Sequence, residues 1–460
     1  MPMPPERLQA LERAVHTQAQ FAAGLRYADL HPKTVRQGKR ILLDSLGCMA
    51  AGSLSLGKDE LPQGDFPIVG HDAADEDTAV FLSGTAMVKN ELDEGNQFAF
   101  GHPACHVVPA LLAESGRLHL SGKEFLTALT AGYEIACRWS AAVSLRPSAH
   151  VHGTAATAGA AAAVGAARKL PEQTLCDTLL LAASLPQNAA WESAFHGDQI
   201  RNAYIGLSNV VGMRAADMVR FGVASSFQTL ESVWTEVFGE GLCPETLTKG
   251  LGTEFLIEKN YMKRYAACRY VHAFADAVSE FMQDGLQADQ IGRIHLRTYR
   301  AAAHLCGQSA ENGFAARFSI PVALAILLVR GSLTIETMTD EAARDPAVLA
   351  LAKRITVEED AGYTALLPQV RANHIAVWRT DGAKLEKEIR AARGDYLLPL
   401  TDAELKQKFR SLSASVWSEE RQNLLTAMAA NLENLADMAE LAVLLDASIS
   451  RTAKRGKPTC

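Results

Sequence analysis

The sequence lacks an excess of positive charge. Its 45 lysines and arginines are outnumbered by 52 aspartates and glutamates, and the formal net charge is −7. The lysines and arginines are scattered along the chain, so no local cluster offsets the negative total. Because nucleic acids bind basic surfaces, this composition argues against a nucleic-acid partner.

Long hydrophobic runs are also missing. The most apolar stretches, such as AAAAVGAA and LLLAASL, are far shorter than the roughly 20 residues that a membrane-spanning helix needs. The first residues, MPMPPERLQALERAV, include early acidic side chains and no apolar core, unlike a secretory or transit peptide. We therefore expect no membrane association and a cytoplasmic location.

Cysteines are few and are not arranged in pairs. None of them forms a C-x-x-C motif, and this spacing predicts reduced thiols in a cytosolic protein. The eight residues are Cys48, Cys105, Cys137, Cys176, Cys243, Cys268, Cys306 and Cys460.

The 460 residues are too many for one simple core, and their pattern changes along the chain. Helical spacing dominates the first half, where SGKE at 121–124 predicts a capping box, and it returns at TDAE, 401–404. Between about 291 and 398, alternating segments such as RITVEED and NHIAVWRTDGAKLEKEIR predict strands, and TDG in the second predicts a turn between two of them. Helical spacing persists between the strands, around 320–328 and again from 340 to 351. The sequence thus predicts a mainly α protein, with a large all-helical domain from residues 1–264 and 400–460 and a smaller α+β domain, 265–399, inserted between them.

Alanine and glycine are concentrated in the segment HGTAATAGAAAAVGAARKL, which begins at His152. Small residues let a neighbouring backbone approach closely, so we expect this helix to lie at the centre of a bundle. In the preceding GYEIACR segment, Glu134 and Arg138 are four residues apart and are interpreted as a structural ion pair.

The stretch GHPACHVV, 101–108, allows three interpretations: a metal site, a catalytic site or a packed turn. His102, Cys105 and His106 could bind zinc. However, Pro103 disfavours helical geometry at His102, and no further histidine and acidic pair at a familiar zinc spacing completes a site, so we expect no metal.

Two other charged segments are candidates for chemistry. KNELDEGNQFAFGHP places Glu91, Asp93 and Glu94 shortly before His102, where a carboxylate can orient a histidine for proton transfer; the alternative is a solvated acidic loop. The segment NYMKRYAACRYVHAFADA, 260–277, carries several lysine and arginine side chains near the point where helical spacing gives way to alternating spacing. These cations could bind a carboxylate substrate, or they could simply be surface charges.

Four segments in the same order resemble the MmgE/PrpD family of 2-methylcitrate dehydratases, cis-aconitate decarboxylases and iminodisuccinate epimerases. They are KNELDEGNQFAFGHP, AGYEIACR, HGTAATAGAAAAVGAA and KRYAACRYVHAFADA. The resemblance implies a helical domain built from both ends of the chain, an α+β lid domain, a homodimer, and activity on di- and tricarboxylic acids with neither metal nor organic cofactor.

The resemblance also implies roles for individual residues. His102 matches the family's active-site histidine, His152 the histidine that opens its small-residue helix, and Lys263 its lysine. Asp93 is the best match for the acidic stretch, although one extra residue separates it from His102. The candidate catalytic residues are His102, His152, Lys263, Asp93 and Tyr133, and the candidate substrate-binding residues are Arg201, Cys268, Arg269, His272 and Asn96.

Two departures from the family pattern affect the predicted reaction. Cys268 stands where the decarboxylases have a second histidine, and Arg201 lies where many members have a lysine. We therefore expect a cofactor-free lyase or isomerase, with dehydration of a hydroxylated polycarboxylate as the leading reaction. The alternatives are an epimerase of an amino- or imino-dicarboxylate, a cis-aconitate decarboxylase-like enzyme, and a catalytically silent carboxylate binder.

Overall fold

The computed structural model describes residues 4–57 and 60–445. Within them, helices predominate, which confirms the prediction of a mainly α protein. None of the helices in this part of the chain is long and apolar enough to cross a membrane.

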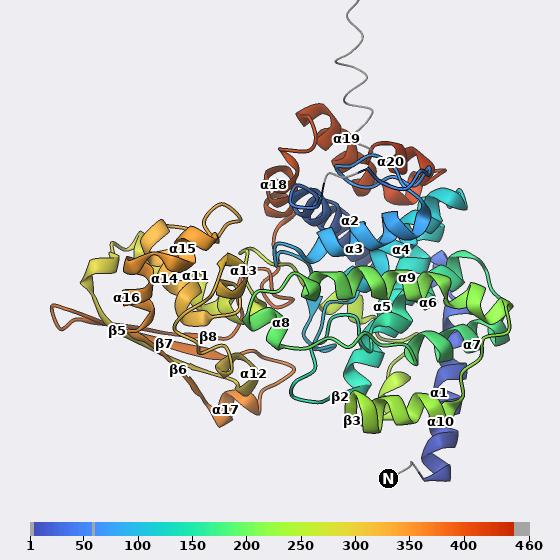
Figure 1. Ribbon diagram of the computed structural model, residues 1–460, viewed down its shortest axis with the longest axis horizontal. Helices are drawn as coiled ribbons and strands as arrows, with labels where there is room; N and C mark the ends of the chain where they lie inside the picture. The colour runs from blue at the N-terminus through green and yellow to red at the C-terminus, as the bar shows by residue number, and fades with distance from the viewer. Residues whose placement is uncertain (1–3, 58–59, 446–460) are drawn as a thin grey trace, which may run out of the picture.

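Helices from both ends of the described chain lie together on one side of the molecule (Figure 1). The C-terminal helix α18 packs against α2, although about 360 residues separate them: the Lys408 ammonium contacts the Asp44 carboxylate at 2.6 Å. The helices of this part are α1 (Pro5–Gly24), α2 (Pro32–Ser53), α3 (Glu76–Val88), α4 (Pro103–Arg117), α5 (Gly122–Ala142), α6 (Thr157–Ala167), α7 (Glu172–Ala183), α8 (Glu192–Phe195), α9 (Ile200–Arg220), α10 (Phe227–Ser232), α18 (Asp402–Ser413), α19 (Glu419–Ala430) and α20 (Ala439–Val443).

The small-residue helix α6 lies at the centre of this part, as predicted, and packs against α4, α5, α7 and α9. The reason is the close approach of its backbone to α5. A side-chain carbon placed on Gly132 of α5 would lie 2.7 Å from the carbonyl oxygen of Gly159 in α6. Only small residues at this crossing permit the observed packing.

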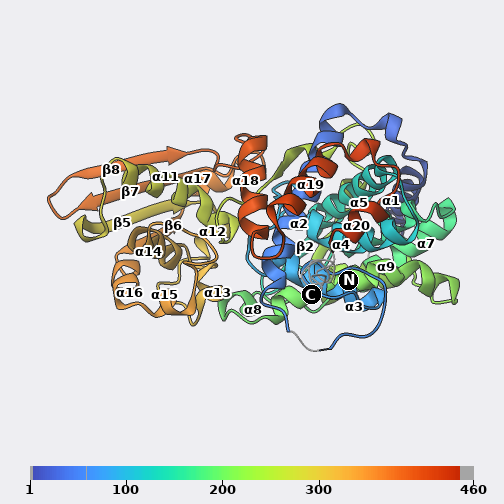
Figure 2. The same ribbon diagram turned by 90° about the horizontal axis from the view of Figure 1, so that it is seen from above.

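The second part is a four-stranded sheet with helices on it, at the left of Figures 1 and 2. The strand order is β6-β5-β7-β8, with β5 parallel to β6 and antiparallel to β7. The strands are β5 (Ile291–Thr298), β6 (Ile355–Glu359), β7 (Asn373–Arg379) and β8 (Lys384–Ile389); the helices are α11 (His272–Gln283), α12 (Arg300–Ala303), α13 (Gly313–Ala316), α14 (Ile320–Arg330), α15 (Asp340–Arg344), α16 (Pro346–Ala352) and α17 (Ala361–Thr364).

Several local predictions are confirmed. Both capping boxes form, with Ser121 and Thr401 each accepting a hydrogen bond from the backbone N–H three residues later. The Thr-Asp-Gly segment connects β7 to β8 as a turn, and Gly382 takes the positive φ of 89° that favours glycine. The seven cysteines of the described residues are all free thiols, whereas Cys460 lies outside them.

Other local predictions need correction. The helical part is not all helix, because it contains the strands β1 (Gly95–Asn96), β2 (Val143–Leu145), β3 (Gly239–Leu242) and β4 (Asn260–Tyr261), paired as β1 with β4 and β2 with β3. The predicted helix from 340 to 351 is two helices, since Asp345 caps a new helix that begins at Pro346. The C-terminal helical pattern is interrupted at 431–438, and its last residues lie outside the described chain. The domain boundaries at 264/265 and 399/400 stay predictions.

Candidate active site

The pairing of β1 with β4 creates the candidate active site. Gly95 lies opposite Tyr261 and Asn96 opposite Asn260, although more than 160 residues separate the two strands. A side-chain carbon on Gly95 would lie 2.3 Å from the Tyr261 hydroxyl, so only glycine permits this approach. The pairing brings the acidic segment before β1 next to Lys263, which lies two residues after the end of β4.

His102 is held in one orientation by two acceptors. Its Nδ1 lies 2.8 Å from the Asp93 carboxylate and 2.7 Å from the Glu94 carbonyl oxygen. Because neither oxygen has a proton to donate, the N–H of the neutral ring is on Nδ1, where it donates to the Glu94 carbonyl oxygen, and the lone pair is on Nε2. This is the arrangement of a histidine that serves as a general base, as proposed from the sequence for His102 and Asp93.

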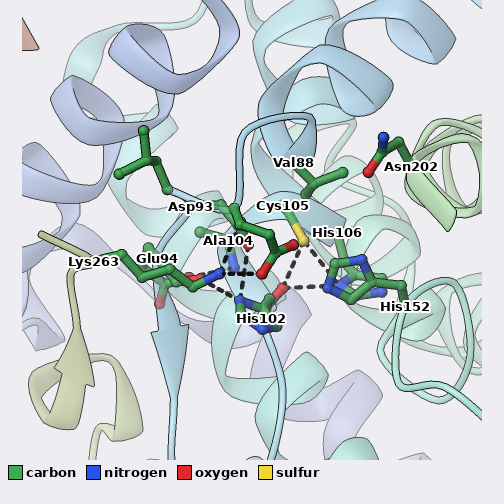
Figure 3. A network of polar contacts seen from close by, with 12 residues as sticks. Val88, Asp93, Glu94, His102, Ala104, Cys105, His106, His152, Asn202 and Lys263 are labelled. Carbon is green, nitrogen blue, oxygen red and sulfur yellow. Dashed lines mark hydrogen bonds and ion pairs between the residues drawn. The ribbon is translucent and has the colours of Figure 1, made fainter. Parts of the chain in front are cut away.

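Lys263 lies on the other side of Asp93 (Figure 3). Its ammonium group is 3.3 Å from Asp93 and 2.9 Å from Glu91, and all three side chains are buried. Burial by itself would raise the pKa of Asp93, but the charge of Lys263 and the nearby N–H of His102 outweigh it and hold this pKa well below its usual range. Conversely, burial would lower the pKa of Lys263, and the two carboxylates raise it instead. Asp93 is therefore ionised and Lys263 protonated near neutral pH.

Arg201, at the start of α9, extends the cluster to His152. Its guanidinium forms an ion pair with Glu91 and donates to Nε2 of His152 at 3.3 Å. Burial and the Arg201 charge lower the pKa of His152 well below its usual range, so this ring is neutral. Since Nε2 accepts from Arg201, the proton is on Nδ1, which is buried and has no hydrogen-bond partner among the described residues.

His106 supports the position of His152 rather than binding a metal. Its Nδ1 donates to the His102 carbonyl oxygen at 2.9 Å, and its Nε2 accepts from the Gly153 backbone N–H at 2.9 Å. Cys105 also points to the His102 carbonyl oxygen. The histidine-proline turn therefore does not bring the predicted alternative zinc trio together: His102 caps α4 outside the helix, whereas Cys105 and His106 lie within its first turns.

A different trio could offer metal ligands. Ligand atoms of Asp93, His102 and His152 lie within 4.8 Å of one another. Both Asp93 oxygens, however, already contact Lys263 or His102, and Arg201 adds a second nearby positive charge. Two cations beside a three-ligand set disfavour a divalent ion, so the donor set fits a metal poorly.

Tyr133 and Asn96 hold the backbone and the Glu94 side chain near His102. The Tyr133 hydroxyl donates to the Glu94 carboxyl, whose other oxygen accepts from the Ala104 N–H at 3.1 Å. Burial raises the pKa of Glu94 to about 8, so this carboxyl is largely protonated at neutral pH. The Asn96 amide donates to the Leu256 carbonyl oxygen at 2.8 Å, and its oxygen accepts from two backbone N–H groups. These contacts favour a structural role for both predicted site residues.

The remaining predicted residues lie on the α+β side. Arg269 forms an ion pair with Asp395 at 3.0 Å and covers the Tyr261 ring at 4.7 Å. His272 contacts the Ala267 carbonyl oxygen, and burial lowers its pKa well below the usual range. Cys268 is buried, and burial raises its thiol pKa to about 11, so it is not a thiolate at neutral pH.

The sequence interpretation missed two residues that the structure brings to the site. Glu91, named there only as part of an acidic segment, joins Arg201 to Lys263 and has a positive φ of 54°, unusual for a residue other than glycine. Tyr261 lies 6.3 Å, ring centre to ring centre, from His102. The strand pairing that places both could not be recognised from two-residue strands.

The cluster is nearly closed in the structure. A cavity of about 520 Å³ between α2, α18 and residues 333–336 has Asn90, Leu92 and Arg264 in its wall, but none of the clustered side chains. Of the His102, Asp93, Lys263, Glu91 and Arg201 side chains, only His102 has more than 1% of its surface exposed, at 13%. A substrate would therefore meet His102 first.

Comparisons with known proteins relate the chain to one family. Models of the MmgE/PrpD N-terminal and C-terminal domains match residues 17–244 and 265–434. A cis-aconitate decarboxylase of Aspergillus terreus is 22% identical over 469 residues, which cover 93% of this chain and 95% of that protein. Human cis-aconitate decarboxylase is 23% identical over 476 residues, covering 95% of each chain. The cis-aconitate decarboxylase-like protein oryM of Aspergillus oryzae is 23% identical, covering 92% of this chain and 95% of its own.

Proposed function

The chain belongs to the MmgE/PrpD family and is an enzyme of the lyase or isomerase type, and on this premise we propose that it acts on a di- or tricarboxylic acid at the carbon next to a carboxylate. In this proposal the reaction requires neither a metal nor an organic cofactor. The observation that carries it is the His102 imidazole, which Asp93 orients with its Nε2 lone pair free and which borders a group of buried cations.

The proposed chemistry begins with removal of a proton by Nε2 of His102. Proton loss next to a carboxylate builds up enolate charge, which fixed cations and hydrogen bonds stabilise in a water-poor site. Lys263 and Arg201 supply two such cations, and their contacts with Glu91 keep them in place before substrate arrives. Asp93 stabilises the imidazolium that forms on His102.

Dehydration is the leading reaction within this proposal. Loss of a hydroxyl group needs an acid as well as a base. His152 supports this assignment because its Nδ1 N–H lacks a partner among the described residues and its ring lies 5.0 Å from that of His102, centre to centre. In the proposal, His102 takes the proton and, as the imidazolium, returns it to the departing hydroxyl, which leaves as water with formation of the alkene. The neutral His152 donates a hydrogen bond from Nδ1 to that hydroxyl.

Decarboxylation of a cis-aconitate-like substrate is the second candidate. It is favoured by the similarity to the Aspergillus terreus and human proteins, which are cis-aconitate decarboxylases. Against it stands Cys268, at the position where the family's decarboxylases are expected to have a histidine. A neutral, buried thiol is a weaker proton donor to a carbanion than an imidazolium.

Two further properties are proposed from the family resemblance. The protein acts as a homodimer, and it is located in the cytoplasm. Size-exclusion chromatography with light scattering tests the first, and microscopy of a tagged full-length chain tests the second.

Proton NMR in deuterium oxide tests the reaction. The purified protein is incubated separately with citrate, 2-methylcitrate, malate, tartrate, cis-aconitate and iminodisuccinate. We expect an alkene signal together with loss of the hydroxy-acid signals from one hydroxy acid. Loss of a carboxyl group from cis-aconitate would instead establish the second candidate, and deuterium uptake without elimination would establish an epimerase.

Two separate histidine variants, one in the site and one at the surface, control this experiment. His102→Ala should abolish the reaction, whereas His119→Ala should not, because His119 contacts Asp437 at the surface and its side chain is 71% exposed. Undiminished turnover by the His102 variant would refute the site assignment, and no turnover of any substrate by the wild-type protein would refute the proposed reaction class.

A further inference from the structure

Arg371 is a buried cation near the candidate site with no counter-charge among the described residues. Arg371 precedes β7 and is 9% exposed. Among the described residues, no carboxylate lies within 4.0 Å of its guanidinium and no side-chain hydrogen bond involves it; Nη1 is fully buried without a partner. By contrast, Arg201 and Lys263 contact Glu91, and Arg269 contacts Asp395.

An unpaired buried charge needs a physical explanation. A buried ion without a partner in general destabilises the folded state. The guanidinium of Arg371 instead faces aromatic rings, 5.2 Å from the centre of Tyr261 and 5.7 Å from that of Tyr270. Such contacts compensate only part of the lost hydration. The planar fork of five N–H donors in an arginine matches the two oxygens of a carboxylate.

The position of Arg371 relates it to His102. The Tyr261 ring contacts both, with its centre 6.3 Å from the imidazole centre and 5.2 Å from the guanidinium carbon. The segment that carries Arg371 also contacts the site directly, because the Gln97 amide donates to the Pro368 and Gln369 carbonyl oxygens at 2.6 and 3.0 Å. His102 and Arg371 therefore border the same aromatic ring.

Arg269 provides an internal comparison, because it also stacks on Tyr261 and is also buried. Asp395 neutralises Arg269, so that arginine requires no ligand. Burial by itself would lower the pKa of Arg371, but the neighbouring tyrosines and, after them, the same aspartate raise it. Asp395 does so without contacting Arg371 within 4.0 Å. The guanidinium of Arg371 stays charged at any physiological pH.

We propose that Arg371 forms a second carboxylate subsite, which binds a substrate carboxylate other than the one next to the reacting carbon. This inference rests on the proposed function and adds which residue binds the second carboxylate of the substrate. Arg371 thereby selects polycarboxylates over monocarboxylates. Lys263 and Arg201, which contact Asp93 and His152, act on the reacting end.

Isothermal titration calorimetry with three stable probes tests this subsite. The probes are tricarballylate, succinate and propionate, which have three, two and one carboxylates. We expect wild-type protein to bind the first two more tightly than propionate. Arg371→Leu should weaken binding of these two on the order of 10- to 100-fold, since one charge-assisted contact is lost, and leave propionate unchanged. Arg371→Lys should restore part of the affinity.

Two further measurements separate this role from a structural one. Arg300→Leu is the matched control, since Arg300 lies in the same part of the molecule but is 70% exposed and pairs with Glu359; its affinities should equal those of the wild type. Without probes, Arg371→Leu should unfold at or above the wild-type temperature, because an unpaired buried charge is removed. A purely structural arginine would give a lower unfolding temperature and unchanged probe selectivity.

Equal binding of succinate by wild type and Arg371→Leu would overturn the subsite, as would failure of the wild type to bind any probe. The proposed reaction fails differently. A wild-type protein that binds succinate through Arg371 but turns over no hydroxy acid would refute the reaction and keep the subsite. Turnover that requires His102 but is insensitive to Arg371→Leu would keep the reaction and refute the subsite.

Discussion

On the helical side of the site, each buried cation contacts a carboxylate: Lys263 and Arg201 share Glu91, and Lys263 also contacts Asp93. On the α+β side, Arg317 and Arg371 have no carboxylate within 4.0 Å among the described residues. Burial lowers the pKa of Arg317 to about 10, and its Nη1 donates only to neutral oxygens of residues 89 and 90.

This difference distinguishes positioning from binding. Charges that are already paired hold one another in place and give His102 a fixed orientation, whereas an unpaired cation can gain a new partner when an anionic ligand arrives. The helical side thus provides a preorganised proton-transfer group, and the α+β side provides uncompensated positive charge.

The largest expected effect concerns the paired centre. The negative charge of Asp93 orients His102 and partly balances the positive charge of Lys263. Asp93→Asn removes this charge, so turnover should fall by about 10²- to 10⁴-fold. Steady-state kinetics on the substrate found by NMR measures this. Asp437→Asn is the matched control, because Asp437 contacts the exposed His119 at 2.7 Å. Similar losses in both variants would contradict the assigned role of Asp93.

The second prediction compares the two arginines on Tyr261 directly. Arg269→Leu leaves the buried Asp395 carboxylate without its cation, and the free energy of unfolding should fall by about 3–5 kcal/mol. Arg371→Leu leaves no carboxylate behind and should not lower it. Urea denaturation of both variants without ligand measures the difference. Equal destabilisation by the two substitutions would remove the distinction between paired and unpaired cations.

The third prediction concerns Glu94, whose pKa burial raises from 4.5 to about 8. A carboxyl with a raised pKa in the folded state makes the folded protein progressively less stable as pH rises from 4.5 to 8. Glu94→Gln should remove this dependence. The stability of the variant relative to the wild type should therefore grow over that interval, by at most about 1.4 kcal/mol for each pH unit.

Urea denaturation at several pH values between 4.5 and 9 measures this relative stability. Glu240→Gln serves as the control, because Glu240 is exposed. Parallel stability curves for the wild type and the Glu94 variant would show that the Glu94 carboxyl is ionised over the whole interval.

The smallest expected effect concerns the helix that carries Tyr133. Ser121→Ala removes the cap of α5 and should lower the free energy of unfolding by about 1 kcal/mol without changing turnover. Thermal unfolding with activity measurement checks both. Ser415→Ala, an exposed serine that caps no helix of the described chain, should leave both unchanged. Loss of turnover in the Ser121 variant would indicate that α5 helps to position the site.

Local patterns were sufficient for much of the fold. The serine and threonine boxes at 121 and 401 and the alternation around Gly382 identify their helix starts and hairpin turn from a few adjacent residues. These predictions succeed because a cap or a turn satisfies its own backbone groups locally. The Asp345-Pro346 break was missed because its apolar spacing continues through the helix junction.

The motifs of the sequence by themselves determined the family, the mainly α composition, and His102, His152, Lys263 and Asp93 as candidate site residues. Only the tertiary structure decided which charges are paired. Asp395 neutralises Arg269 across 126 residues, Glu91 joins Arg201 to Lys263, and Arg371 is left without a counter-charge among the described residues. The reason is physical: the strength of an ion pair depends on distance and burial, and both are fixed by packing between distant segments.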